Sequence, residues 1–291
     1  MPQSFHRKRE VATSIRAIAV AEIDRALAAI SDGDADEAEI IHTVRQQLKR
    51  LRALIRLPRG HFEAYGEENA AFRDLGRKLA RTRDSDVLRQ TYDGLVTRAG
   101  RRVPAAVRRR VLAGSGKKSP GTPGRRPLLE GEIASGLRAA RERAKRWRFG
   151  RKGFPLIAGG LRRVYAEMRE GEKLAADHST AMNFHEWRKY TKYHASQLAL
   201  LTPVAPEIIK GYRKIADKLA VALGDHHDLD VLRAAADGVR NDAAADPLFE
   251  VIKRRDRKLA SRAFRLGDEL SAERPADFLR RIEVSWKSWR R

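Results

Sequence analysis

Apolar residues recur at spacings of three and four along almost the whole chain, as in helices that bury one face. Val, Ile and Thr never cluster, and few segments alternate apolar with polar residues, so strand signals are almost absent. Ala, Leu, Arg, Glu and Lys dominate, and these residues favour helices. The sequence therefore predicts an all-α protein.

Helix boundaries follow from the positions of helix-breaking residues. Breaks are expected at Asp32-Gly33-Asp34, Leu57-Pro58, Thr202-Pro203 and Arg274-Pro275. The predicted helices cover residues 7–31, 36–57, 67–82, 85–112, 129–149, 155–174, 179–202, 205–224, 228–241, 246–270 and 275–289.

One segment near the middle of the chain differs from the rest. Residues 113–127 combine Gly, Pro, Ser and basic residues and contain no acidic residue. Such a composition cannot pack a core, so we expect a flexible basic linker there. It divides the 291 residues into a first helical half, residues 5–112, and a second helical half, residues 128–291.

Two motifs occur in the same order on both sides of this linker. The pattern apolar-His-x-x-Arg-x-x-x-Lys begins at Ile41 and again at Phe184, and Asp-x-Asp-Val-Leu begins at Asp84 and again at Asp228. The repetition predicts an internal duplication that forms two pseudo-symmetric helical bundles of the four-helix type. Asp84 and Asp228 precede stretches with helical periodicity, which favours N-caps at both positions, with Asp86 and Asp230 stabilising the helix starts.

The charge of the chain indicates an anionic partner. Lys and Arg number 61 against 38 Asp and Glu, a formal net charge of +23. A folded chain with this charge repels itself, and its usual partners are nucleic acid, an anionic membrane surface or another polyanion. Cysteine is absent, which excludes disulfides and thiolate metal sites. No long apolar run follows the basic start, so we expect a soluble cytoplasmic protein without a membrane span.

The first motif places a row of potential cations on one helix flank, next to an apolar flank. The row consists of His42, Arg45, Lys49, Arg52 and Arg56. At 1.5 Å per residue it extends about 21 Å, which suits an extended anion better than a single phosphate. The second motif repeats the layout with a row formed by His185, Arg188, Lys189 and Lys192.

Two further helices are predicted to carry basic faces. One face contains Arg141, Lys145 and Arg148, and the other contains Arg162, Tyr165 and Arg169. Solvated Lys/Arg faces are common, but acids are scarce on these arcs, so pairing within the helix cannot neutralise them. We interpret all four rows as contacts to a chain of phosphates, because arginine grips phosphate oxygens in pairs. The sequence offers no catalytic residue, no metal ligand set and no cofactor motif.

The chain resembles the CHAD family (conserved histidine α-helical domain). The resemblance rests on the two His-x-x-Arg-x-x-x-Lys helices, each followed by Asp-x-Asp-Val-Leu, and on the segment from Gly159 to Tyr165. It covers roughly residues 5–290, so a single CHAD domain is expected over residues 1–291. The resemblance implies two bundles around a basic central groove or pore. It also implies binding of inorganic polyphosphate, often at polyphosphate granules, without known catalysis.

The chain departs from the family pattern in two ways. Tyr193 and Ala195 stand in the second motif where the first has Arg50 and Arg52, so the second basic row is shorter. The Glu-x-Glu-x-Lys signature of the triphosphate-tunnel domain that often accompanies this family does not occur. Triphosphatase activity is therefore not expected.

Three alternative functions remain open. The charge also suits a non-specific nucleic-acid-binding protein, although no recognition helix or aromatic-bearing sheet is evident. A scaffolding protein could use the basic surface to dock an acidic partner. An HD-like metal-dependent phosphohydrolase would use His226-His227-Asp228 together with His194 and with Asp237 or Asp246. The first copy of that element reads Arg83-Asp84, which argues against a metal.

Overall fold

The computed structural model describes residues 4–79, 84–99, 103–113 and 125–291. Within these ranges every regular element is a helix or helical turn, which confirms the all-α prediction. The α-helices are α1 (Val11–Ser31), α2 (Glu37–Ile55), α3 (Tyr65–Lys78), α4 (Asp84–Ala99), α5 (Ala105–Leu112), α6 (Arg125–Leu128), α7 (Ala134–Lys145), α8 (Pro155–Asp177), α9 (Ala181–Leu201), α10 (Pro206–Ala235), α11 (Asp246–Leu270) and α12 (Pro275–Arg290).

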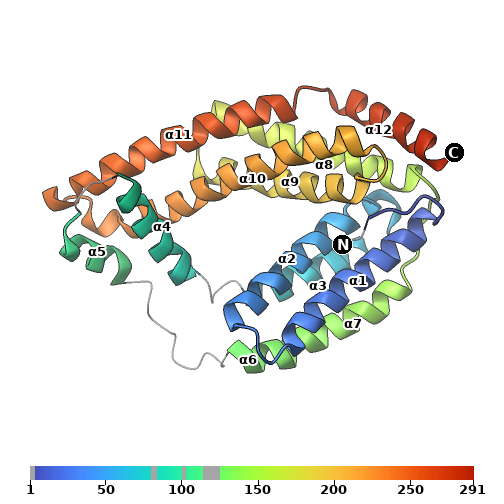
Figure 1. The fold of residues 1–291 in the computed structure, drawn as a ribbon, viewed down its shortest axis with the longest axis horizontal. Helices are drawn as coiled ribbons and strands as arrows, with labels where there is room; N and C mark the ends of the chain where they lie inside the picture. Colours follow the sequence, from blue (N-terminus) through green and yellow to red (C-terminus); the bar gives the residue numbers. More distant parts are fainter. Residues whose placement is uncertain (1–3, 80–83, 100–102, 114–124) are drawn as a thin grey trace.

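The helices form two bundles, one above the other in Figure 1. The lower bundle contains α1, α2, α3 and α7, and α7 packs against α1 and α3. In the upper bundle α9 packs against both α8 and α10, α11 lies on α10, and α12 lies on α8. The two bundles meet where α2 contacts α9.

The bundles do not coincide with the two predicted halves of the chain. Helix α7 follows the predicted linker but packs with α1 and α3, whereas α4 precedes it but packs on α10 and α11. Tyr92 and Val107 accordingly share a buried cluster with Leu229 and Val251. The predicted boundary at residues 113–127 is therefore wrong as a division between bundles. Residues 114–124 of that predicted linker lie outside the described part of the chain.

The helix pairings run in parallel along the chain. The contacts α1–α2, α2–α3 and α1–α7 recur as α8–α9, α9–α10 and α8–α12. The two motif helices, α2 and α9, hold the same place in this order. Such a parallel is what an internal duplication would produce.

Side-chain caps fix where the two motif helices begin. The Asp36 carboxylate accepts a hydrogen bond from the Ala38 backbone N–H, and the Thr180 hydroxyl accepts one from the Asn183 N–H. Both caps satisfy donors that the first turn of a helix leaves unpaired.

Two predicted boundaries were wrong. Helix α10 runs without interruption through Gly224, because the buried positions keep their spacing from Leu223 through Leu229 to Leu232. Asp228 therefore lies inside a helix and is not an N-cap, and the side chains of Asp84 and Asp86 lie outside the described residues. The predicted helix 85–112 is divided, with α4 ending at Ala99 and α5 beginning after Pro104. Proline disfavours a helical conformation in the residue before it.

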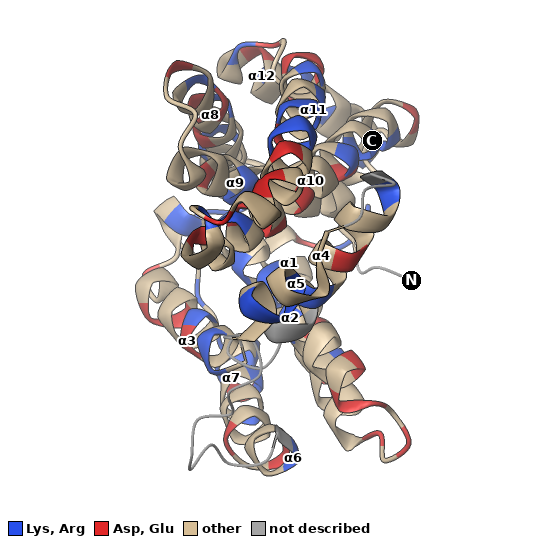
Figure 2. Ribbon diagram, turned by 90° about the vertical axis from the view of Figure 1, so that its left-hand side faces the viewer, with Lys and Arg blue, Asp and Glu red and all other residues tan. Residues whose placement is uncertain are grey.

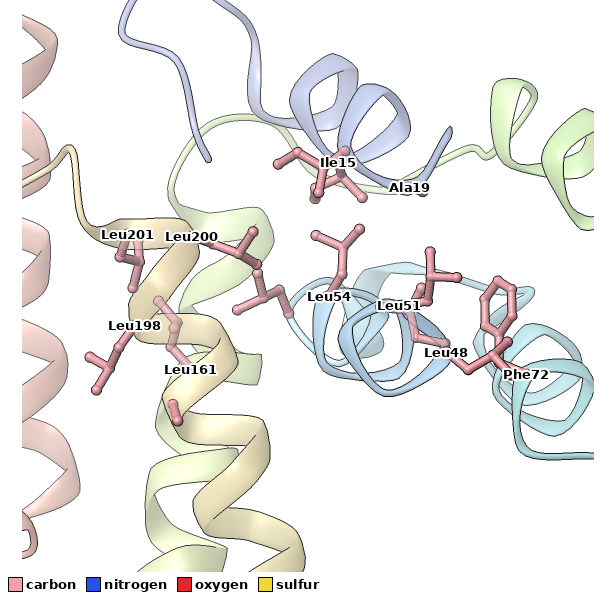
Figure 3. Close-up of a cluster of buried hydrophobic side chains, with 14 of the residues drawn as sticks. Ile15, Ala19, Leu48, Leu51, Leu54, Phe72, Leu161, Leu198, Leu200 and Leu201 are labelled. Atoms are coloured by element: carbon pink, nitrogen blue, oxygen red, sulfur yellow. The ribbon is translucent and has the colours of Figure 1, made fainter. Parts of the chain in front are cut away.

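A hydrophobic core continues from one bundle into the other. Figure 3 shows a part of this core in which leucines of α8 and α9 approach the apolar side chains of α1, α2 and α3. The labelled residues are Ile15, Ala19, Leu48, Leu51, Leu54, Phe72, Leu161, Leu198, Leu200 and Leu201. This shared core fixes α2 against α9. Among the described helices, none combines the length and apolar character that crossing a membrane requires.

Candidate functional site

A groove of about 740 Å³ lies between α2 and α9, with α1 and α10 at its sides. In Figure 2, Lys and Arg colour the ribbon in the middle of the view, where the labels of α1, α2 and α5 lie close together, and Asp and Glu mark α10. The basic and histidine side chains that line the groove are His42, Arg45, Lys49, Arg50, Arg52, His185, Arg188, Lys189, Lys192 and Arg213. Eight of the predicted site residues are thus brought together from two helices 143 residues apart in sequence.

The amphipathic pattern of each motif helix turns its basic row toward this groove. On α2, Val44, Leu48 and Leu51 are buried, and the cations follow on the adjacent arc. On α9, Phe184, Trp187 and Thr191 are buried and fix the opposite row in the same way. The Gln197 side chain donates a hydrogen bond of 3.2 Å to the Ala53 carbonyl at the crossing of the two helices. The buried flanks therefore determine that the two basic rows line one cavity.

Arg188 is a partly buried cation of the groove. Burial lowers the pKa of its guanidinium; Asp228 opposes this change, and the charge of Arg45 lowers the pKa further. Its Nε is buried and has no hydrogen-bond partner in the described part of the chain. The space beside it comes from Gly224, where an added Cβ would lie 3.8 Å from Nε. A half-buried guanidinium with an unused donor and a like charge nearby favours an anionic ligand.

Arg52, in the row on α2, is also a cation whose charged form is disfavoured by burial and by neighbouring positive charges. Burial lowers its pKa, the Tyr193 hydroxyl opposes this change, and Arg56 and Arg73 lower it further. The Asn69 side-chain oxygen accepts hydrogen bonds of 3.2 Å from both Arg52 and Arg56. Asn69 therefore fixes both guanidinium groups but adds no negative charge.

Four carboxylates also line the groove, and of these only Asp228 was singled out from the sequence, as an N-cap and in the metal-site alternative. Glu22 lies 2.8 Å from Arg25 and 3.7 Å from Arg50, and Asp225 accepts a hydrogen bond of 3.0 Å from Arg255. The other two are Asp217 and Asp228 of α10. These carboxylates come from α1 and α10, and Glu22, Asp217 and Asp225 each form an ion pair with an arginine. Helical periodicity predicts the face of one helix but not the helices packed against it.

His185 lines the groove, and His227, which is not among the residues that line it, lies next to His185. The His185 ring is 5.4 Å from the ring of His227, which was not predicted as a site residue. Burial lowers the pKa of both histidines, and Arg188 lowers each further. His227 belongs to the His226-His227-Asp228 motif, whose histidines were predicted only as part of the metal-site alternative.

Several predicted site residues lie elsewhere. Arg141 is held by Asp24 at 2.6 Å and contacts Glu142, which also binds Lys145 at 2.6 Å. Arg141 and Lys145 are therefore neutralised by acids outside the groove, one of them on α1. Arg148 and Arg162 line two other cavities, and Arg169 is not among the residues that line the groove.

The predictions that Tyr165 and Arg56 belong to the binding site also require correction. Tyr165 is fully buried, and its hydroxyl donates to the backbone carbonyls of Leu270 and Glu273. Burial raises the pKa of this hydroxyl to about 12, so Tyr165 belongs to the core and not to a binding face. Arg56 lies just beyond the groove, with its guanidinium over the Tyr193 ring.

The structure does not bring together the residues that were predicted for the metal-site alternative, but it places two other residues beside His226. His194 is buried in the core beside Tyr165 and does not join the His226 motif. His226 instead lies between Asp230, at 3.3 Å, and Asp256, at 3.2 Å. The three side chains have the ligand types of a metal site, with their ligand atoms within 4.8 Å of one another. The two carboxylates approach opposite nitrogens of the imidazole ring. This arrangement suits a histidine that bridges two aspartates as well as it suits a metal site.

The fold defines a class of all-helical proteins in which two bundles meet and basic rows on two helices line one groove. The CHAD domain family model matches residues 17–237, so the chain belongs to the CHAD domain family. The chain also resembles the crystal structure of the CHAD domain from the plant Ricinus communis. That match has a TM-score of 0.51 and 19% identity, and it covers 99% of this chain and 95% of the plant chain. A comparison with curated proteins finds no match.

Proposed function

We propose that this protein binds inorganic polyphosphate in the groove between α2 and α9 and does not catalyse its cleavage or synthesis. The observation that carries this proposal is the convergence of the cations of both motif helices on one cavity. The row on α2 follows the helix axis, so a linear anion can contact its members one after another. The resemblance to the CHAD family supports polyphosphate as that anion.

The groove contains a hydrogen-bond donor without a partner and cations that repel one another, and a phosphate could satisfy both. The unpaired Nε of Arg188 can donate to a phosphate oxygen, and an anion there would reduce the repulsion between Arg188 and Arg45. Arg52 gains in the same way, because like charges lower its pKa. Lysines such as Lys189 and Lys192 add point charges along the chain.

One detail of the groove favours polyphosphate over nucleic acid. Non-specific proteins that bind single strands use aromatic rings as stacking surfaces for bases. The aromatic residue that lines this groove is Tyr193, and its ring already carries Arg56 at 3.8 Å and Arg52 at 5.9 Å. Bases would therefore add bulk to the ligand, and the one Phe, Tyr or Trp ring among the described residues that line the groove is already covered by arginines.

The decisive comparison measures affinity for long-chain polyphosphate and for single- and double-stranded DNA at equal phosphate concentration across a salt series. We expect polyphosphate to bind more tightly than either DNA at physiological salt. Tighter binding of DNA would overturn the proposal. Incubation of polyphosphate with the protein and Mg²⁺ or Mn²⁺ tests the absence of catalysis, because release of phosphate would contradict it.

Variants test the groove itself. Arg45→Ala with Arg188→Ala removes one cation from each row, and we expect polyphosphate affinity to fall by about 10- to 100-fold at low salt. The slope of log K against log salt should become shallower by roughly 0.7 per lost phosphate contact. Arg141→Ala with Lys145→Ala is the matched control, because it removes the same charge from residues held by Asp24 and Glu142. Equal losses in both double variants would mean that net charge, and not the groove, determines binding.

We also propose that the protein associates with polyphosphate granules, as the family resemblance implies. Fluorescence microscopy of the tagged protein tests this location. The parent should co-localise with granules, and Arg45→Ala with Arg188→Ala should be diffuse. A parent that stays away from granules would contradict the location but not the binding.

A further inference from the structure

The helical turn Arg59–His61, which follows α2, lines two adjoining cavities outside the groove. The larger, of about 700 Å³, also involves the start of α8 and the start of α12. The smaller, of about 600 Å³, involves residues 148–150. We call the two cavities together the turn pocket. Its basic and histidine side chains are Arg59, His61, Arg148, Arg162, Arg163 and Arg274.

The turn pocket contains little negative charge. No Asp or Glu is among the described residues that line the larger cavity, and Glu63 is the acid that lines the smaller one. Arg274 bonds Asp277, whereas Arg162 and Arg163 are exposed and have no ion pair within the described ranges. Arginines gathered without acids repel one another, and an anion offsets that repulsion.

Close packing of α8 on the end of α2 builds this pocket. A Cβ at Gly160 would lie 2.2 Å from the carbonyl oxygens of both Arg56 and Leu57, so a glycine is required for the two backbones to approach. The approach places Arg162 and Arg163 of α8 on the same cavity as Arg59. Two predicted residues that the groove does not include, Arg148 and Arg162, are thus gathered around one turn.

The turn pocket continues the basic row of α2. Arg52 lines the groove, Arg59 lines the turn pocket, and Arg56 lies between them in sequence. Arg52 belongs to α2, Arg56 is the residue that ends this helix, and Arg59 begins the helical turn that follows. Because an extended chain spans at most about 3.6 Å per residue, the Cα atoms of Arg52 and Arg59 lie no more than roughly 25 Å apart, a distance that a long polyphosphate chain can span. One extended anion can therefore reach from the groove to the turn pocket.

We propose that the turn pocket is a second binding site for the same polyphosphate chain that the groove holds. This inference rests on the proposed function and extends it to the length of the ligand. A chain long enough to occupy both sites gains from the high effective concentration of its second segment. A short anion such as tripolyphosphate occupies each site separately.

The test uses Arg162→Ala with Arg163→Ala, since both side chains are exposed and the helix should be unaffected. We expect the affinity for long-chain polyphosphate to fall by about 10-fold, with a shallower salt slope. Calorimetry with tripolyphosphate should give two sites per chain for the parent and one for this variant. Arg262→Ala with Arg265→Ala is the control; both are exposed on α11, line neither the groove nor the turn pocket, and remove the same charge.

The outcomes separate this inference from the proposed function. If Arg162→Ala with Arg163→Ala binds long chains as tightly as the control while Arg45→Ala with Arg188→Ala does not, the groove stands and the second site is overturned. If the parent itself fails to bind polyphosphate, the proposed function fails. A single tripolyphosphate site in the parent, lost only in the groove variant, would also overturn the second site.

Discussion

The guanidinium of Arg56 lies 3.8 Å from the centroid of the Tyr193 ring, and this contact joins the two motif helices. Tyr193 occupies the position at which the first motif has Arg50, so it shortens the basic row on α9. The same ring supports the end of the row on α2, because Arg52 lies 5.9 Å from it. The tyrosine that stands in place of a cation in the row on α9 therefore positions two cations of the row on α2.

This arrangement predicts different effects for two substitutions of Tyr193. Tyr193→Phe keeps the ring, and we expect the free energy of unfolding to change by less than about 1 kcal/mol. Tyr193→Ala removes a nearly buried ring and its cation–π contacts, and we expect a loss of about 3 kcal/mol. Urea unfolding followed by circular dichroism measures both. Similar losses for Phe and Ala would mean that the hydroxyl, and not the ring, stabilises the contact.

Adjacent glycines at the start of α8 offer a matched pair of variants. A Cβ at Gly160 would overlap two backbone oxygens of the α2 end, so Gly160→Ala must separate the helices and should cost about 3 kcal/mol. A Cβ at Gly159 meets nothing within 4 Å, and Gly159→Ala should stabilise the helix by about 0.5–1 kcal/mol. Thermal or urea unfolding distinguishes them. Equal effects would show that the α8–α2 approach is not tight.

The sequence predicted the helices and the basic rows because both depend on local periodicity. Val44 and Leu48 mark the buried face of α2, and the cations beside them could only lie on the adjacent arc. The pairing of α2 with α9 across one groove depends on how the bundles interleave. Helix α7 packs on α1, and α4 packs on α10, although each is separated from its partner by many residues. No local pattern reports such contacts.

The errors in the candidate site have the same origin. Arg162, Tyr165 and Arg169 share a spacing that suits either a binding face or a buried face, and the structure places Tyr165 in the core. Arg141 appeared unpaired because its acid, Asp24, belongs to a helix 117 residues away in sequence. Helical spacing identifies residues that share a face, but it does not identify what that face contacts.

His185, which lines the groove, and the neighbouring His227 predict that polyphosphate binding depends on pH. Burial, followed by Arg188, lowers the pKa of His185 and of His227 below the ordinary value, so the free protein holds both largely neutral near pH 7. A phosphate placed beside them favours the imidazolium form and raises both pKa values. Binding should therefore take up protons, and affinity should rise as the pH falls from 8 toward 6.

Calorimetry in buffers with different ionisation enthalpies measures this proton uptake. The control is His185→Gln with His227→Gln, which should reduce the uptake at pH 6.5 while the cations of both rows remain. Long-chain polyphosphate is the ligand of choice, because its few terminal groups add little titration of their own. Proton uptake that is unchanged in the double variant would contradict a role for these histidines.

His194 predicts a loss of stability in acid that is independent of any ligand. The ring is fully enclosed beside Tyr165 and Phe278, and neither nitrogen has a hydrogen-bond partner among the described residues. Burial, followed by Arg281, lowers its pKa from 6.5 to about 3. In the unfolded chain the same histidine binds a proton below about pH 6.5. Its contribution to stability is therefore complete above pH 6.5 and is lost progressively as the pH falls toward 3.

The free energy of unfolding, measured by urea between pH 7.5 and 4.5 for the parent and for His194→Leu, tests this assignment. Carboxylates shared by both proteins cancel in the difference between the two curves. Below pH 6.5 the parent should lose up to roughly 1.4 kcal/mol per pH unit more than the variant, because leucine has no proton to gain. The Leu variant should therefore match or exceed the parent at pH 4.5, even if a change in packing costs it about 1 kcal/mol at pH 7.5. Parallel curves over the whole range would mean that His194 binds its proton equally in the folded and the unfolded chain, and this would contradict the lowered pKa.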